Sequence, residues 1–199
     1  MELKKIEKSE IKNVVEVHKD SFNGFFLTTL GNRFLSLYYD CIRRDNESIL
    51  LGIYDENILS GFCAATILSK GFNLKLIKNN PLKFLTIGFI LLISKPDSLI
   101  RLIKNFSKSN PEIIDNGEYS ELLSIGISSN YQGKGIGRKL LTELEKELKL
   151  KNSSKLSLTT DYNNNNKAIE FYKGLGYTIY YDFIAYPDRK MYRMIKKLK

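Results

Sequence analysis

A glycine-rich segment at residues 131–138 carries the clearest chemical signal in this sequence. It follows an apolar stretch that ends at Ile127 and precedes a helical pattern of leucines. Gly133, Gly135 and Gly137 let backbone N–H groups approach a ligand closely, and a helix N-terminus adds unpaired N–H donors and partial positive charge. The segment therefore predicts a pyrophosphate site, although a tight strand-to-helix turn without a ligand can have the same glycines. Its order, Q-x-x-G-x-G, matches neither a P-loop nor a Rossmann fingerprint.

A second group of residues lies about 30 positions downstream. Asn165, Ala168 and Tyr172 are spaced i, i+3 and i+7, so they share one face of a helix. That face carries an amide, a small side chain and a phenol, whereas a helix that only packs in a core favours three apolar residues. For Tyr172, a packed ring whose hydroxyl reaches the surface is the alternative interpretation.

Together the glycine loop and the Asn165…Ala168…Tyr172…Gly176-Tyr177 motif resemble the GNAT superfamily of acetyl-CoA-dependent N-acetyltransferases. The resemblance is strongest over residues 121–177. It implies an α+β fold in α/β/α layers, with a mixed, mostly antiparallel sheet of about seven strands flanked by helices. It also implies acetyl-CoA as cofactor and direct transfer of its acetyl group to an amine.

The resemblance assigns a role to several cofactor residues. The Ile127 N–H would polarise the thioester carbonyl, the Ile125 carbonyl and Asn165 would hold the pantetheine arm, and Tyr172 would hydrogen-bond the departing thiolate. The full implied cofactor set is Ile125, Gly126, Ile127, Gln132, Gly133, Lys134, Gly135, Ile136, Gly137, Arg138, Asn165, Ala168 and Tyr172.

A base is also needed, because an alkyl amine is mostly protonated at neutral pH. Glu121 begins the strand that ends at Ile127 and is the candidate catalytic and substrate-binding acid, with Glu118 or a water chain as alternatives. Strict alternation would place Glu121 on the same side as Leu123, Ile125 and Ile127, unless a bulge changes the parity. A solvated glutamate at a strand start is the non-catalytic interpretation.

Aromatic residues near the first helix are candidates for the acceptor wall. Phe22, Phe25 and Phe26 lie where family members form that wall, and their alternative is a place in the core. His18, the one histidine, is expected on the surface of the first helix or at an interface, not as a base.

The elements that position these residues follow from apolar periodicity and turn residues. We expect a single domain over residues 1–199, with 43% hydrophobic residues to build its core. The expected helices cover about 9–21, 31–44, 138–150 and 165–173, and the expected strands 2–7, 48–54, 58–68, 119–127, 156–160, 177–183 and 191–197.

Residues 70–110 form a helical insertion between the third and fourth strands in this interpretation, with Pro81 and Pro96 at helix starts or breaks. Residues 70–108 hold eight Lys or Arg and one acid, Asp97, within a chain of net charge +9. The insertion is expected to cap the acceptor side with its apolar faces buried there or in a homodimer contact, and lying on a membrane surface is the rival. The uncharged apolar run 84–93 is too short to span a bilayer.

Three functions stay open. The first is acetylation of a small-molecule amine, such as an amino sugar or a nucleotide-linked amino sugar, which the basic surface favours. The second is acetylation of a protein N-terminus or lysine, and the third is a non-catalytic acyl-CoA-binding or membrane-surface module. The charged N-terminus lacks a signal-peptide pattern, so a cytoplasmic protein is expected. Cys41 and Cys63 form no CxxC pair, so no metal site is expected, and no module predicts specific nucleic-acid binding.

Overall fold

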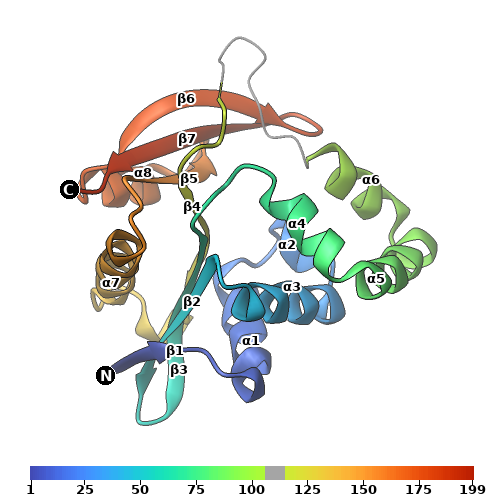
Figure 1. Ribbon diagram of the computed structural model, residues 1–199, viewed down its shortest axis with the longest axis horizontal. Helices are drawn as coiled ribbons and strands as arrows, with labels where there is room; N and C mark the ends of the chain where they lie inside the picture. The colour runs from blue at the N-terminus through green and yellow to red at the C-terminus, as the bar shows by residue number, and fades with distance from the viewer. Residues whose placement is uncertain (106–114) are drawn as a thin grey trace.

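A mixed sheet of seven strands forms the centre of the molecule (Figure 1). The computed structural model describes residues 1–105 and 115–199. The strand order is β1-β2-β3-β4-β5-β7-β6, and every neighbouring pair is antiparallel except β4 and β5. The strands are β1 (Glu2–Lys5), β2 (Ser48–Asp55), β3 (Ile58–Thr66), β4 (Ser120–Ile127), β5 (Lys155–Asp161), β6 (Thr178–Ala185) and β7 (Arg189–Lys197).

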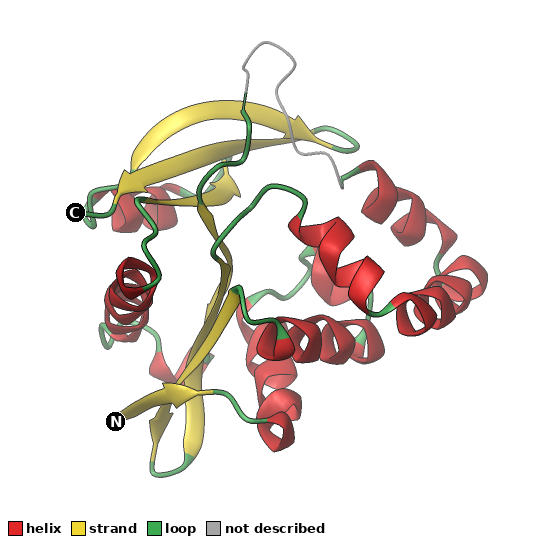
Figure 2. Ribbon diagram, viewed as in Figure 1, coloured by secondary structure: helices red, strands yellow, loops and turns green. Residues whose placement is uncertain are grey.

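Helices cover both faces of the sheet, with α1 and α3 on one side and α7 and α8 on the other (Figure 2). Successive residues of β3 point to opposite faces, so Phe62 packs in the core under α1 and α3, whereas Cys63 packs in the core under α7. The helices are α1 (Ile11–Ser21), α2 (Phe26–Thr29), α3 (Asn32–Arg44), α4 (Phe72–Asn79), α5 (Pro81–Ser94), α6 (Pro96–Lys104), α7 (Ile136–Leu150) and α8 (Asn166–Lys173), with short 3₁₀ turns at Lys8–Glu10 and Ser129–Tyr131. The predicted fold class is confirmed.

The parallel strands β4 and β5 pair only at their beginnings. Their register joins Ser120 to Leu156, Glu121 to Ser157 and Leu122 to Leu158. Beyond this point β4 continues to Ile127 and β5 to Asp161 without pairing to each other, so the sheet opens between them. An opening of this kind exposes backbone groups that a ligand can bind.

A β-bulge lies in β4 at Leu123. The register pairs Ala64 with Ser124 but Ala65 with Leu122, so two neighbouring partners on β3 are separated by an extra residue on β4. The bulge places Leu123 against the core under α1 and α3, where Ser124 also points, toward Tyr39. Bulges of this kind are common beside active sites.

The bulge overturns the parity expected for Glu121. Leu122 packs in the core under α7, so Glu121 lies on the opposite face, the same side as Leu123. Ile125 and Ile127, however, pack with the core under α7. Strict alternation would have placed Glu121 on the same side as both isoleucines, but the strand contains the kind of bulge that was expected to change this parity.

Between β3 and β4, the described residues form three consecutive helices, α4, α5 and α6. Pro81 and Pro96 each occupy the first turn of a helix, where a missing N–H costs nothing. The last part of the predicted helical stretch, residues 106–110, lies outside the described residues. The Lys95 ammonium donates to the Thr29 carbonyl at 2.6 Å, which ties the junction of α5 and α6 to α2.

The apolar residues of α5 are less buried than the sequence predicts. Leu91 is buried, and Phe84 and Ile87 pack against the core, but five large apolar side chains of this helix are exposed: Leu82, Leu85, Phe89, Leu92 and Ile93. In the described part of the chain, no single helix has the length and hydropathy to cross a membrane. Only α4 and α5 together reach that length and hydropathy, and they are bent by 102° relative to one another.

Candidate functional site

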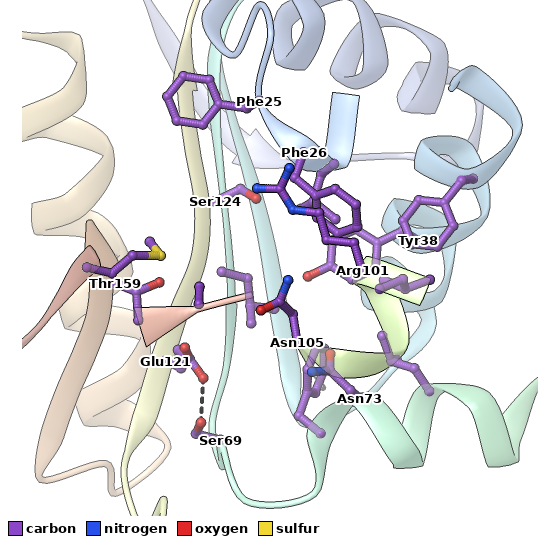
Figure 3. Close-up of a pocket in the computed structure, with 18 of the residues that line it drawn as sticks. Phe25, Phe26, Tyr38, Ser69, Asn73, Arg101, Asn105, Glu121, Ser124 and Thr159 are labelled. Atoms are coloured by element: carbon purple, nitrogen blue, oxygen red, sulfur yellow. Dashed lines mark hydrogen bonds between the residues drawn. The ribbon is translucent and has the colours of Figure 1, made fainter. Parts of the chain in front are cut away.

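A cavity of about 1190 Å³ runs from the opening between β4 and β5 to the space beneath the inserted helices (Figure 3). Its first end is lined by residues of β4, β5 and α8, and its second by residues of α2, α4, α5 and α6. Ligand sites typically measure about 300–1,000 Å³, so this cavity has room for more than one small group.

The face of α8 singled out by its spacing lines the first end of the cavity. Asn165, Ala168 and Tyr172 all contribute to the lining, together with Ile125 of β4. The Asn165 amide donates to the Thr160 hydroxyl at 2.6 Å, which fixes its side chain at the start of α8. The predicted shared face is therefore present and faces the opening in the sheet.

Tyr172 combines a packed ring with an uncommitted hydroxyl. Its ring centroid lies 5.2 Å from that of Phe171 and 5.9 Å from that of Tyr177. Burial raises the pKa of the Tyr172 phenol to about 12, so the hydroxyl keeps its proton at neutral pH. Within the described residues the hydroxyl has no hydrogen-bond partner, so it is free to donate to a ligand in the cavity.

The backbone of β4 presents polar groups to the opening. Ser128 donates its N–H to the Ser60 carbonyl at 2.9 Å, so the adjacent pair, Ile127 and Gly61, falls at a non-hydrogen-bonded position of the antiparallel ladder. The N–H and carbonyl of Ile127 consequently point away from β3, toward the side of β5, and those of Ile125 do the same. The Ile127 carbonyl accepts from the Ser21 hydroxyl at 2.9 Å and from the Gln132 amide at 3.2 Å, which leaves its N–H for a ligand.

The glycine loop lies beside the outer end of the opening and leads into α7. Gly133 and Gly135 have φ of +77° and +76°, a region that disfavours side chains, and Gly135 is the residue that precedes the helix. Ile136 anchors the first turn in the core, whereas Lys134 and Arg138 are exposed. The first N–H groups of α7 have no acceptor within the helix, so the loop fits a bound phosphate.

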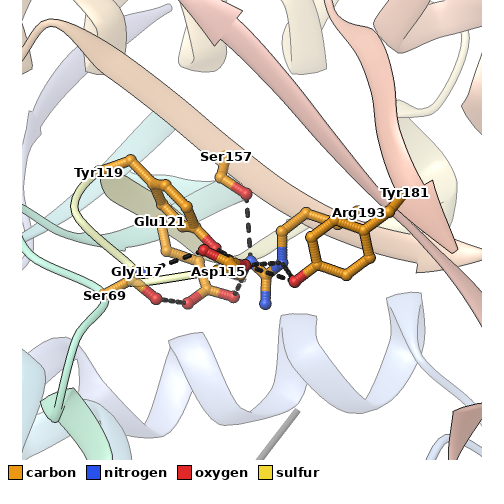
Figure 4. Close-up of polar contacts among 8 residues, drawn as sticks. All are labelled: Ser69, Asp115, Gly117, Tyr119, Glu121, Ser157, Tyr181 and Arg193. Carbon is orange, nitrogen blue, oxygen red and sulfur yellow. Dashed lines mark hydrogen bonds and ion pairs between the residues drawn. The ribbon is translucent and has the colours of Figure 1, made fainter. Parts of the chain in front are cut away.

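Glu121 lies in the cavity wall within a network of buried polar residues (Figure 4). The Arg193 Nη1 atom lies 3.1 Å from Glu121 Oε1, and the Ser69 hydroxyl donates to Glu121 Oε2. Arg193 is 3% exposed and also donates to Ser157 and Tyr181. Burial disfavours its charge, but Glu121, Tyr119 and Tyr181 together outweigh burial and raise the pKa of the guanidinium.

Asp115 completes the network on the other side of Arg193, with its Oδ2 atom 3.6 Å from Arg193 Nε. Burial raises the pKa of this carboxyl, but hydrogen bonds from Tyr119, Tyr181 and the Gly117 N–H outweigh burial and lower it below its usual range. Two carboxylates thus flank one buried guanidinium, and the hydrogen bonds from Arg193 and Ser69 hold the Glu121 side chain in position.

The other predicted residues divide between the cavity and the remainder of the structure. Phe22, Phe25 and Phe26 line the second end of the cavity, and their role as the acceptor wall stays a prediction. Glu118 does not line it, and its exposed side chain lies 3.7 Å from Lys70. His18 is 2% exposed, so its predicted surface location was wrong, and burial lowers its pKa to about 4.

Sequence reasoning found Glu121 but missed Arg193, which binds it. Its signal was a cation at an inward position of β7, between Met191 and Ile195 in the alternating pattern. Its partner Glu121 is 72 positions away in the sequence, and nothing local connects the two. Among residues 1–105 and 115–199, no group of three or more His, Cys, Asp or Glu side chains could hold a metal ion.

Solved structures with the same arrangement are acetyltransferases. The ribosomal-protein-S18-alanine N-acetyltransferase from Escherichia coli has a TM-score of 0.63 at 12% identity, covering 100% of this chain and 94% of its own. An aminoglycoside 6'-N-acetyltransferase complexed with coenzyme A has a TM-score of 0.63 at 14% identity, covering 100% and 98%. Naa20 of Chaetomium thermophilum, in complex with a bisubstrate analogue, has a TM-score of 0.62 at 16% identity, covering 100% and 87%. At these identities the likeness establishes the fold.

The sequence itself establishes the family. None of the curated proteins matches this chain in sequence. A family model described as the acetyltransferase (GNAT) family matches residues 11–177, most of the chain and both of its motifs. This chain therefore belongs to the GNAT family of acetyltransferases, which use acetyl-CoA.

Proposed function

We propose that this chain transfers the acetyl group of acetyl-CoA directly to a primary amine of a small molecule. One observation carries the proposal: a single cavity joins Tyr172 and the open edge of β4 to Glu121 and the space beneath the inserted helices. Donor and acceptor groups can therefore meet without a covalent enzyme intermediate.

The residues of the first end fit the donor. The glycine loop and the first turn of α7 would bind the pyrophosphate, and the Ile125 carbonyl and Asn165 would hold the pantetheine arm between β4 and β5. The small Ala168 allows close approach at this face of α8. Acetyl-CoA supplies a thioester whose carbonyl carbon is electrophilic.

The chain's own groups would promote the transfer in three ways. The Ile127 N–H donates to the thioester oxygen, where negative charge develops as the amine attacks. Glu121 accepts the proton that the amine must lose, directly or through water, while Arg193 and Ser69 hold the carboxylate in place. The Tyr172 hydroxyl donates to the sulfur as it leaves.

The contacts of the inserted helices favour a small acceptor. Asn105, just after α6, accepts from the Tyr186 N–H at 2.7 Å and donates to the Tyr186 carbonyl at 3.1 Å. Together with the bond between Lys95 and Thr29, these contacts hold the insertion against both α2 and the turn between β6 and β7. An acceptor end bounded in this way suits an amino sugar or a nucleotide-linked amino sugar better than a polypeptide.

An assay of acetyl-CoA consumption against a panel of amines tests the proposal. The panel contains amino sugars, nucleotide-linked amino sugars, polyamines, aminoglycosides, and peptides with a free N-terminus or lysine. We expect turnover with small amines that exceeds turnover with peptides. Faster turnover with peptides would establish a protein acetyltransferase, and binding of acetyl-CoA with no turnover on any amine would establish a non-catalytic module.

A further inference from the structure

The acceptor end of the cavity contains one cation that differs from the others. Among the residues that the structure describes, four Lys and Arg side chains line the cavity: Lys70, Arg101, Arg189 and Arg193. Three of them form ion pairs, Lys70 with Glu118, Arg189 with Asp161, and Arg193 with Asp115 and Glu121. Arg101 forms no ion pair with any residue in the described part of the chain.

The surroundings of Arg101 leave its hydrogen-bonding edge unused. The guanidinium lies 4.7 Å above the ring of Phe26, so the ring covers one of its faces (Figure 3). Its Nε atom is buried and, among the described residues, has no hydrogen-bond partner. A guanidinium is charged at every pH that proteins tolerate, and a buried donor without a partner is unfavourable. An acceptor on a ligand at the Nε edge would remove that cost.

The rest of this end is mainly apolar. Its walls are formed by apolar residues of the inserted helices: Phe72 and Leu76 of α4, Phe84 and Leu91 of α5, and Leu99 and Leu102 of α6. On a different side of the cavity from Arg101, Glu121 accepts from Ser69 (Figure 3), and Arg193 also holds it (Figure 4). The cavity therefore offers a carboxylate to an ammonium group and, separately, a guanidinium fork to an oxyanion, with apolar walls around them.

We propose that Arg101 binds an oxyanion of the acceptor, a carboxylate or a phosphate, so that the acetylated amine belongs to an anionic molecule with an apolar or ring-shaped body. This inference rests on the proposed function, because it assumes that the amine acceptor enters this cavity. The planar guanidinium would bind the oxyanion through its Nε edge, while Phe26 supports the opposite face. Arg101 then selects the acceptor and positions its amine, and takes no part in proton transfer.

Matched pairs of acceptors test the inference. UDP-glucosamine is compared with glucosamine for the phosphate arm, and 6-aminohexanoate with hexylamine for the carboxylate arm. Wild-type protein should favour the anionic member of at least one pair by about tenfold or more in kcat/KM, and the pair that responds identifies the oxyanion. Arg101→Met should abolish that preference by lowering kcat/KM for the member that carries the oxyanion about tenfold more than for the member that lacks it, while the KM for acetyl-CoA stays unchanged. Arg101→Lys should restore only part of it, because lysine lacks the fork.

Lys83→Met is the matched control, because Lys83 is an exposed cation of α5 outside the cavity lining. It should keep the wild-type preference. Retention of the preference by Arg101→Met, or no preference for either anionic acceptor in the wild type, would overturn the inference.

Calorimetric titration of the same four amines into the acetyl-CoA complex separates this result from the proposed function. Selective binding of an anionic amine that requires Arg101 would support the inference even if no amine is acetylated. Turnover on the amines that lack an oxyanion, with no preference for their oxyanion-bearing counterparts, would support the proposed function and refute the role of Arg101.

Discussion

Replacing Tyr172 with Phe removes one hydroxyl and leaves the ring in place. The ring still packs 5.2 Å from Phe171 and 5.9 Å from Tyr177. Since the hydroxyl has no partner among the described residues, its loss should change the free energy of unfolding by less than about 0.5 kcal/mol. Its loss from the reaction should matter far more, because a hydrogen bond to a charged sulfur contributes about 1.5–3 kcal/mol.

That range corresponds to a decrease in kcat of roughly 10- to 150-fold, with little change in the KM for acetyl-CoA. The phenol pKa of about 12 means that Tyr172 stays protonated across the assay range, so the decrease should not depend on pH. Release of the coenzyme A thiol provides the assay, and thermal unfolding provides the stability measurement.

Tyr177→Phe is the matched control. The Tyr177 hydroxyl donates to Glu145 at 3.0 Å and does not line the cavity, so this variant should lose about 1 kcal/mol of stability and keep its kcat. A wild-type kcat in Tyr172→Phe, or an equal loss in both variants, would refute a contact between Tyr172 and the leaving group.

Three further predictions follow from the site. Gly135→Glu should abolish acetyl-CoA binding measured by calorimetry. The control is Gly71→Glu, which lies at another helix start with φ of +71° and open space, and it should bind acetyl-CoA normally. If both variants bind acetyl-CoA with equal affinity, the pyrophosphate binds elsewhere. Glu121→Gln should lower kcat/KM by about 10²- to 10⁴-fold, most strongly at low pH, where the amine holds its proton. The control Glu118→Gln should leave the pH–rate profile unchanged. If the profiles of Glu121→Gln and the wild type match, another group is the base. In the folded protein the pKa of His18 is about 4, below its ordinary value of 6.5, so between pH 6.5 and pH 4 the unfolded chain binds more protons than the folded one. The free energy of unfolding should therefore fall by up to about 3 kcal/mol as the pH falls through this range, and His18→Phe should remove this part of the pH dependence in denaturant titrations. Parallel curves for the variant and the wild type would show that His18 does not titrate this way.

The sequence predicted the elements well because each carried its own local signal. The leucines of α7 recur at helical spacing, and Pro81 and Pro96 lie at helix starts, one of the two positions expected for them. The Asn165, Ala168 and Tyr172 face was also predictable, because helical geometry alone brings its members together.

The side of Glu121 and its partner Arg193 depend instead on how distant strands pair. The bulge at Leu123 is defined by the register between β3 and β4, and Arg193 reaches Glu121 only because β7 lies beside β5. The burial of His18 has a similar origin. Its Nδ1 atom forms a hydrogen bond of 2.7 Å with the hydroxyl of Tyr39 in α3, which lies 21 positions away in the sequence. Such contacts have no local pattern that predicts them.

A single-turnover experiment tests direct transfer within one cavity most directly. The protein is mixed with acetyl-CoA, first without an amine and then with the best amine of the panel. The masses of the protein and of the small molecules are measured by mass spectrometry after each step. Direct transfer predicts an unchanged protein mass in the first step, followed by one acetylated amine for each coenzyme A thiol released. A protein that gains the mass of one acetyl group before the amine is added, and loses it to the amine afterwards, would contradict this mechanism.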